Sequence, residues 1–491
     1  MRIFKSMLIL LLIGAAFIYA GTDVNFDEFY KDKTFRIDYF HIGDAETEFI
    51  TIDHIYNYGV WAGSKTNLID KFNNGRYYAH IYDLSSNKLI YSKGFDSYFG
   101  EYQSSGDAAS GIKRSYHESV LMPSPKSKIK FVLSKRNKDN ELVPFFETEI
   151  DPDDVMIIQD NVDDDQVQIH KSLYNGPAHH KVDVVILAEG YSKNDNKKFV
   201  KDLEKFTKTF FKQEPYKSCK EKFNVYGVFK PSMESGIDEP RAGIFRNTIL
   251  DVTFNSLGSE RYVMTENNKA MRDLAAHVPY DAIYIMVNHK RYGGGGIYNL
   301  YCTFTTDNQW QDYLFLHEFG HSFSGLADEY YTSATAYNDF YKKGVEPVEP
   351  NITALLDPKN IKWKHLLTKG IEIPTPWEKE DYDKTDYAWQ KKRREMNNKT
   401  AELKKKGADA ALVLKAEQDY ETADRERSIK VDEYLQKSKY KNMVGAFEGA
   451  GYSAKGMYRS MLDCIMFSKG SKPFCKVCEE HIEKVINFYA Q

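Results

Sequence analysis

The segment 315–330, FLHEFGHSFSGLADEY, constrains the fold of this chain more than any other feature. Residues four apart lie one above the other on a helix, so His317 and His321 can present two imidazoles to one metal ion, about 2.0 to 2.1 Å from each nitrogen. Glu318 lies one residue further on and can accept a proton from an attacking water without itself binding the ion. The segment therefore predicts a buried helix that carries a zinc site.

The residues after His321 predict the third metal ligand. Gly325 can adopt the left-handed conformation that ends a helix, so the chain can turn back and bring Asp328 toward the ion. Two imidazoles and one carboxylate leave a fourth position for water, as in catalytic rather than structural zinc sites. Glu329 is the alternative third ligand. The carboxylate that does not bind the ion is expected to orient a ligand histidine through its other ring nitrogen.

Length and composition set the class of protein. A chain of 491 residues is long enough for two or three packing units. Hydrophobic residues make up 42% and charged residues 28%, which is typical of a globular protein. The formal charge of -4 gives no reason to expect binding to nucleic acid, which normally requires a clustered positive surface.

The N-terminus has the pattern of an export signal. Arg2 and Lys5 precede an apolar run at 7–17, and small residues follow at Ala20 and Gly21. The run is too short to cross a bilayer comfortably, so an uncleaved membrane anchor is the less favoured alternative. We expect residues 1–20 to be a signal peptide. The mature protein would then be exported, to the periplasm, the cell surface or the medium, without a stable membrane span.

The periodicity of the sequence changes along the chain. Short alternating runs separated by turn residues predict a small all-β sandwich over 21–150. The acidic, polar stretch at 151–180 predicts a linker. Near-continuous apolar runs at 182–188, 223–229 and 282–287 then predict strands buried on both faces, with helices between them, in a second domain at 181–491. Within that domain, the charged stretch at 381–440 predicts a helical hairpin insertion, so the fold class is α+β.

Five cysteines lie in a chain for which export is predicted, so disulfides are permitted. Cys475 and Cys478 have the spacing of a zinc ribbon, but such a ribbon needs a second pair, and only Cys464 is near. We therefore expect one disulfide from Cys464 to Cys475 or Cys478 in preference to a structural metal.

Several further segments match one known family in its order. Together with the histidine helix, the chain resembles the M64 peptidases, the group named for immunoglobulin A peptidase. The resemblance covers roughly residue 182 to the C-terminus, and the β-rich N-terminal module resembles the one that often precedes it. The matching segments are VVILAEGY at 184–191, YGGGG at 292–296, VGAFEGAGY at 444–452, MYR at 457–459 and FCKVC at 474–478.

The resemblance implies a zincin-like catalytic domain, with a mixed sheet above the metal helix and a methionine-bearing turn beneath it. Met466 is the candidate for that turn, with Met461 second. Tyr458 and Arg459 are candidates for the substrate side, because a phenol can stabilise an oxyanion and an arginine can bind a substrate carboxylate.

The glycine run near Gly294 and Gly295 is expected to form a cleft rim that pairs with an extended peptide. The function expected from these features is that of a secreted endopeptidase with one catalytic Zn²⁺ ion and Glu318 as general base. Its partner would be a protein or peptide substrate, for example a host glycoprotein such as immunoglobulin. Two alternatives remain at this point: an exported binding or adhesion protein with a structural zinc site, and a zinc amidase that acts on cell-wall or glycan amides.

Overall fold

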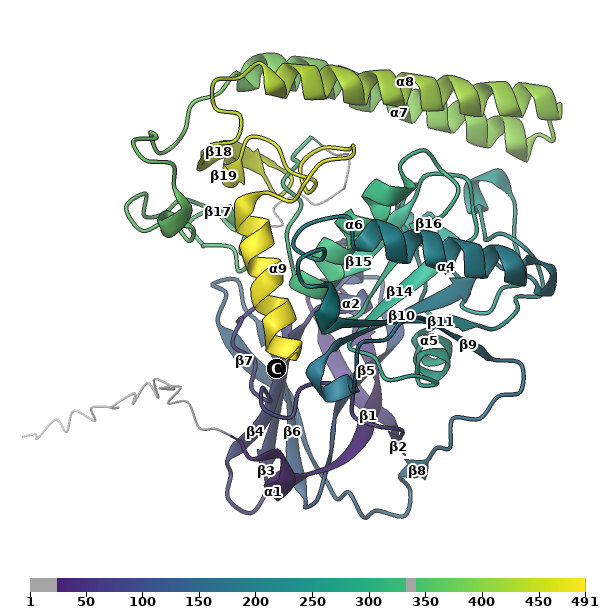
Figure 1. Cartoon of the computed structure of the whole chain (residues 1–491), viewed down its shortest axis with the longest axis vertical. Coiled ribbons are helices and arrows are strands. Elements are labelled where there is room, and N and C mark those ends of the chain that lie inside the picture. Colours follow the sequence, from purple (N-terminus) through teal and green to yellow (C-terminus); the bar gives the residue numbers. More distant parts are fainter. Residues whose placement is uncertain (1–23, 333–340, 491) are drawn as a thin grey trace, which may run out of the picture.

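The computed structural model describes residues 24–332 and 341–490 (Figure 1). It is a mixed α+β structure, in which two N-terminal β-sheets precede a mixed sheet with helices. The predicted signal peptide at 1–20 lies outside the described residues.

Two four-stranded sheets form the N-terminal region and share one hydrophobic core. Phe35 and Ile37 enter this core from one sheet, and Ile81 and Phe131 enter it from the other, all with 0% exposure. The first sheet has the order β5-β1-β2-β8, formed by Arg114–Pro125, Tyr30–Gly43, Glu48–Tyr58 and Ile158–Gln159. The second has the order β4-β3-β6-β7, formed by Leu89–Phe95, Tyr77–Asp83, Ile129–Arg136 and Leu142–Ile150. The short helices α1 (Phe26–Phe29), α2 (Tyr98–Gln103) and α3 (Gly106–Ala109) accompany them.

The third sheet is mixed and is buried on both faces. Its four central strands are parallel, and the edge strands β15 and β9 run antiparallel to their neighbours. Alternate residues of β10 enter two separate cores, with Val184 and Ile186 on one face and Val185 and Leu187 on the other, which explains its continuous apolar sequence. The strand order is β15 (Gly294–Ile297), β16 (Tyr301–Thr305), β14 (Ala282–Val287), β10 (Val182–Glu189), β11 (Phe223–Phe229) and β9 (Gln168–Leu173).

The stretch at 151–180, predicted as a linker, contributes a strand to each neighbouring sheet. Its first strand, β8, pairs with β2, and its second, β9, pairs with β11. The polar composition of both strands explains why they were not predicted, because neither strand carries a buried residue.

Helices cover both faces of the mixed sheet. α4 (Asn196–Phe210) and α6 (Gln311–Ser324) pack in one core, and α5 (Asn268–Ala275) packs in the other. Tyr284 of β14 stacks on Phe315 and Phe319 of α6, with ring centroids 4.5 and 4.7 Å apart. The Tyr284 hydroxyl also donates to the Phe315 carbonyl at 2.8 Å. These contacts fix α6 on the sheet and so determine which way its polar side chains face.

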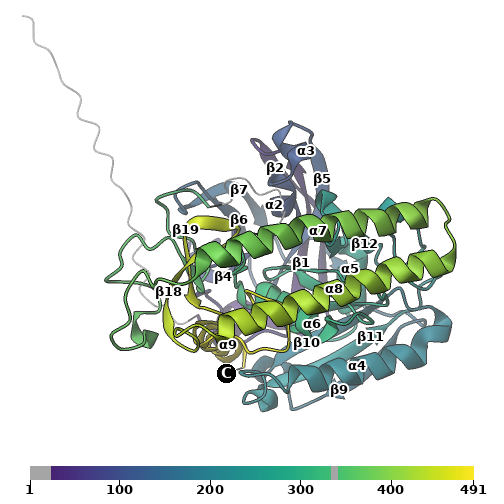
Figure 2. The same cartoon turned by 90° about the horizontal axis from the view of Figure 1, so that it is seen from above.

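A long helical hairpin is inserted before the C-terminal strands, which confirms the predicted insertion. It consists of α7 (Lys379–Lys405) and α8 (Ala410–Gln436), and it lies at the end of the molecule opposite the N-terminal sheets (Figures 1 and 2). Glu260 anchors it by accepting hydrogen bonds from Arg393 at 3.0 Å and Asn397 at 2.7 Å. Within residues 24–332 and 341–490, no helix combines the length and apolar character that crossing a membrane requires.

Two small sheets and a last helix complete the described structure. A three-stranded sheet has the order β17 (Ile352–Thr353), β19 (Ser453–Met461) and β18 (Val444–Ala450), and β12 (Thr253–Phe254) pairs with β13 (Val263–Met264). The last helix, α9 (Lys476–Tyr489), packs in the same core as α6.

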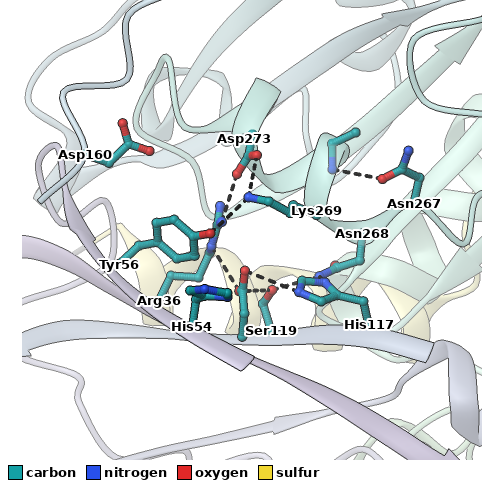
Figure 3. Close-up of polar contacts among 12 residues, drawn as sticks. Arg36, His54, Tyr56, His117, Ser119, Asp160, Asn267, Asn268, Lys269 and Asp273 are labelled. Carbon is teal, nitrogen blue, oxygen red and sulfur yellow. Dashed lines mark hydrogen bonds and ion pairs between the residues drawn. The ribbon is translucent and has the colours of Figure 1, made fainter. Parts of the chain in front are cut away.

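Buried polar contacts join the N-terminal sheets to α5 (Figure 3). Arg36 is 1% exposed and contacts Asp38 at 3.0 Å and Asp273 of α5 at 2.8 Å. Asn268 of α5 donates to Ser119 of β5 at 2.8 Å. Because a buried charge is tolerated only when it is paired, these contacts specify how the N-terminal region docks on the mixed sheet.

Cysteine pairing differs from the prediction. All five cysteines are free, and the sulfurs of Cys464 and Cys478 lie 4.0 Å apart, whereas a disulfide requires about 2.05 Å. The predicted disulfide from Cys464 to Cys475 or Cys478 is therefore wrong.

The aromatic layer between α4 and α6 gives a test of the fold. Phe206 is fully buried, with its ring 4.6 Å from that of Phe304 and 5.2 Å from that of Phe315. We expect Phe206→Ala to lower the free energy of unfolding by about 3 to 5 kcal/mol, since it leaves a cavity among these rings. Phe245→Ala, at a side chain that is 67% exposed, should change it by less than about 0.5 kcal/mol. Urea denaturation followed by tryptophan fluorescence would measure both. Equal midpoints for the two variants would contradict the described packing.

Candidate metal centre

The end of α6 brings the chain back over its own histidines. The helix ends at Ser324, and Gly325 adopts the predicted left-handed conformation with φ 60°. Gly325 donates to the His321 carbonyl at 2.9 Å and Leu326 donates to the Gly320 carbonyl at 3.1 Å, which closes the last turn. A side chain at Gly325 would also lie 2.5 Å from the amide of Asn74. The reversal places Asp328 beside the two histidines.

Three ligand atoms converge on one point. The Nε2 atoms of His317 and His321 lie 3.2 Å apart, and each lies 3.2 Å from Oδ1 of Asp328. The three side chains are largely buried. Ligands about 2.0 to 2.1 Å from a tetrahedral ion are separated by about 3.4 Å, so these atoms are spaced as a single zinc ion requires. They form one of two candidate metal clusters among the residues described.

The hydrogen bonds at Nδ1 indicate where each histidine ring carries a proton. Nδ1 of His317 lies 3.0 Å from the Ile465 carbonyl, and Nδ1 of His321 lies 2.6 Å from the Leu326 carbonyl. Carbonyl oxygens only accept, so each Nδ1 carries a proton, and in the neutral imidazole Nε2 then presents a lone pair. Two lone pairs and a carboxylate oxygen repel one another unless a cation lies between them. The arrangement therefore fits a metal ion.

Tyr452 orients the third ligand. Its hydroxyl donates to Oδ2 of Asp328, which leaves Oδ1 directed at the histidines. The adjacent backbone is fixed as well, because Gly451 donates to the Asp328 carbonyl at 3.0 Å. Tyr452 belongs to a segment that resembles the M64 family, but its separation of 124 residues from Asp328 gave no local sign of this contact.

Glu318 lies beside the ligands and borders the same cavity. Burial raises the pKa of Glu318, and the neighbouring His317 and His321 oppose that shift. The glycine strand β15 packs closely on it, since a Cβ on Gly294 would lie 3.2 Å from Oε1 of Glu318. The structure thus brings the predicted general base and the predicted glycine rim together.

The cavity over the three ligands has a volume of about 140 Å³. Gly294 and Gly295 border it, as do several tyrosines that had no predicted role. The Tyr330 ring is nearly parallel to that of His317, with centroids 6.4 Å apart. Arg261 donates to the Tyr330 hydroxyl at 3.0 Å. The cavity residues beyond the ligands and glycines include Arg261, Tyr262, Tyr292, Tyr313, Tyr330, Tyr341 and Tyr452.

Tyr458 and Arg459, predicted for the substrate side, do not border this cavity. Arg459 has 0% exposure, and its guanidinium donates to the carbonyls of Gly449 at 2.7 Å and Leu462 at 3.1 Å. Its position therefore does not support the predicted role in binding a substrate carboxylate. Tyr458 pairs with Thr353 in the β17–β19 ladder, away from the histidines, so its predicted role as an oxyanion donor is not supported by its position.

Glu329 points away from the histidines. Its Oε1 accepts from Asn351 at 3.1 Å and lies 3.4 Å from the sulfur of Cys478. The expectation that the second carboxylate orients a ligand histidine is wrong, because backbone carbonyls do so instead. Met466, the candidate for the turn beneath the helix, packs against Gly320, where a Cβ would lie 3.0 Å from its sulfur.

Two family models match the chain. The model described as IgA Peptidase M64 matches residues 167–486, and the model described as Peptidase M64 N-terminus matches residues 25–147. The first match alone covers more than half of the chain. It includes the histidine helix, the glycine strand, the hairpin and Tyr452. No curated protein matches the chain.

The ligand assignment can be tested by metal content. We expect Asp328→Asn to lose one metal ion per chain relative to the parent, because a neutral amide replaces the anionic ligand. Asp312→Asn, at an exposed position on the same helix, should retain the full content. Mass spectrometry of metals in dialysed protein would measure both, with circular dichroism as a check of folding. Unchanged metal in folded Asp328→Asn would exclude Asp328 as a ligand.

Proposed function

Because the chain belongs to the M64 family of metallopeptidases, we propose that it is a zinc-dependent endopeptidase with His317, His321 and Asp328 as its metal ligands. The observation that carries this proposal is the convergence of two Nε2 lone pairs and one carboxylate oxygen, each 3.2 Å from the others. Among the residues described, this cluster offers three protein ligands, whereas a structural site is normally closed by four. The alternative of a binding protein with a structural zinc at this position is therefore disfavoured.

When bound, zinc supplies a Lewis acid that polarises the scissile carbonyl and the attacking water. Glu318 then acts as the general base and accepts the proton of that water. Because burial raises the pKa of Glu318 toward neutral pH, its carboxylate is a stronger base than an exposed one. The same carboxyl group can pass the proton to the leaving amine.

We assign stabilisation of the oxyanion to Tyr330 in place of Tyr458. Burial raises the pKa of Tyr330 well above its usual value, and the charge of Asp328 adds to this although Arg261 opposes it, so the phenol keeps its proton. Arg261 donates to the phenol oxygen and strengthens it as a donor. A preformed donor of this kind at the edge of the cavity would stabilise negative charge that develops on the carbonyl oxygen.

The substrate we propose is a protein or peptide, with immunoglobulins among the candidates because of the family description. Gly294 and Gly295 border the cavity without side chains, which leaves room for an extended peptide backbone beside Glu318. Export by the signal at 1–20 would bring the enzyme to such substrates.

We also propose that the chain divides into an N-terminal module at 21–150 and a catalytic domain at 181–491.

The role of Glu318 is tested by Glu318→Gln. We expect kcat/KM on a quenched-fluorescent peptide library to fall by a factor of about 10² to 10⁴, since the amide cannot accept the proton. Metal content should stay at the parental level, because Glu318 is not a ligand. Glu221→Gln, at an exposed position, serves as the matched control and should retain full activity. Hydrolysis by Glu318→Gln at the parental rate would show that the base lies elsewhere.

A comparison of two tyrosines tests the oxyanion assignment. We expect Tyr330→Phe to lower kcat by a factor of about 10² to 10³ with little change in KM, as loss of an oxyanion donor does. Tyr458→Phe should behave like the parent because its side chain does not border the cavity. If steady-state kinetics instead showed a loss of kcat in Tyr458→Phe and none in Tyr330→Phe, Tyr458 would be the oxyanion donor, as predicted from the sequence.

A further inference from the structure

A second group of metal-ligating side chains lies directly behind the histidine site. Glu329, Cys464, Cys475 and Cys478 are each at most 3% exposed, and their ligand atoms all lie within 4.8 Å of one another. They come from three separate segments. Glu329 follows α6, Cys464 follows β19, and Cys475 and Cys478 lie at the start of α9.

The spacing of these atoms matches a tetrahedral ion and not a disulfide. The sulfurs of Cys464 and Cys478 are 4.0 Å apart, and Oε1 of Glu329 lies 3.4 Å from the sulfur of Cys478 and 3.8 Å from that of Cys475. Bonds of about 2.3 Å to sulfur and about 2.0 to 2.2 Å to oxygen place two sulfurs about 3.8 Å apart, and a sulfur about 3.5 Å from an oxygen. The observed distances agree with both values.

Hydrogen-bond donors point at the sulfurs. The backbone N–H groups of Met466 and Cys475 donate to Sγ of Cys464 at 3.5 and 3.2 Å. The Ser460 hydroxyl lies 3.1 Å from Sγ of Cys475. Such donors stabilise a thiolate more than a neutral thiol, because the acceptor then carries the charge. These donors therefore reduce the cost of burying the ionised sulfurs that a metal binds.

In the ionised form that binds a metal, the four ligands carry negative charge that a cation must balance. Oε2 of Glu329 is buried and has no hydrogen-bond partner among the residues described. The buried guanidinium of Arg459 is a cation that acts on Glu329, and its own hydrogen bonds go to backbone carbonyls. A dication among the four ligands would supply the missing charge, with Arg459 compensating part of the remaining negative charge.

We propose that Glu329, Cys464, Cys475 and Cys478 bind a second Zn²⁺ ion in a closed structural site. Four protein ligands leave no open position, so this ion would have no part in hydrolysis. Three thiolates select zinc over hard cations such as magnesium or calcium. The two-residue spacing between Cys475 and Cys478 lets one helical turn supply two of the ligands.

The second site is connected to the first through the backbone. Glu329 is the neighbour of Asp328, and its N–H donates to the Met466 carbonyl at 2.9 Å. Cys464 is the neighbour of Ile465, whose carbonyl orients His317. An ion at the cysteine cluster would therefore hold both the third ligand and a ligand-orienting carbonyl in place. The proposal stands on the cluster alone and does not depend on the proposed peptidase activity.

The test is metal content and cobalt spectroscopy of the full chain purified under reducing conditions. We expect two Zn²⁺ ions per chain in the parent and one in His317→Ala, which disables the first site. The Co²⁺ form of His317→Ala should show the sulfur-to-cobalt charge-transfer band that only thiolate ligands give. Cys478→Ser should lose this band and one ion. Cys219→Ser, at a buried cysteine outside the cluster, should keep both ions and the band.

Three results would overturn the second site. They are a folded His317→Ala protein without metal, a cobalt form of that protein without the charge-transfer band, and an intact mass that shows a disulfide in parent protein purified without reductant. If Cys478→Ser fails to fold, His317→Ala still decides the question, since its cysteines are intact. Peptidase activity is not among the readouts, so failure of the proposed enzymatic function would leave this test unaffected.

Discussion

Two hydrogen bonds from imidazole to backbone determine the chemistry of this molecule. Because Nδ1 of His317 and of His321 each face a carbonyl, both rings turn Nε2 inward, toward Oδ1 of Asp328, and in the neutral ring this atom presents a lone pair. The carbonyls belong to Ile465 and Leu326, one far along the chain and the other in the turn that ends α6. The candidate metal centre therefore depends on how the C-terminal segment is held beneath this helix.

The mixed sheet provides the rigid support for that helix. Its central strands are buried on both faces, so they cannot shift without exposing one of two cores. Tyr284 fixes α6 by ring stacking and by a hydrogen bond to the helix backbone. The glycine strand β15 allows the sheet edge to approach Glu318 more closely than any side chain would permit. In this way the fold presents Glu318 and the three candidate metal ligands together at a small cavity.

The C-terminal segment holds the ligands from the other side. Tyr452 orients Asp328, Ile465 orients His317, and Met466 packs against the helix at Gly320. The buried cluster of three cysteines and Glu329 lies where these segments meet α9. Arg459, with its guanidinium on backbone carbonyls, stabilises the same region. These residues give the histidines and Asp328 a fixed orientation, and of them Tyr452 also borders the cavity.

Local sequence determined the parts of the site that depend on local geometry. The spacing of His317 and His321 places them on one helical face, and Gly325 reverses the chain to reach Asp328, because both effects follow from backbone conformation over a few residues. Charge patterning over 381–440 likewise identified the hairpin. Only the tertiary structure showed that Tyr330, Tyr452 and Arg261 meet at the cavity, that Tyr458 and Arg459 do not, and that the cysteines cluster without a disulfide. Those relations join distant segments, such as Glu329 and Cys478, which are 149 residues apart, and their distances are set by the packing of the sheet and helices. Periodicity and spacing describe each segment alone, so they carry no information about which segments the core brings into contact.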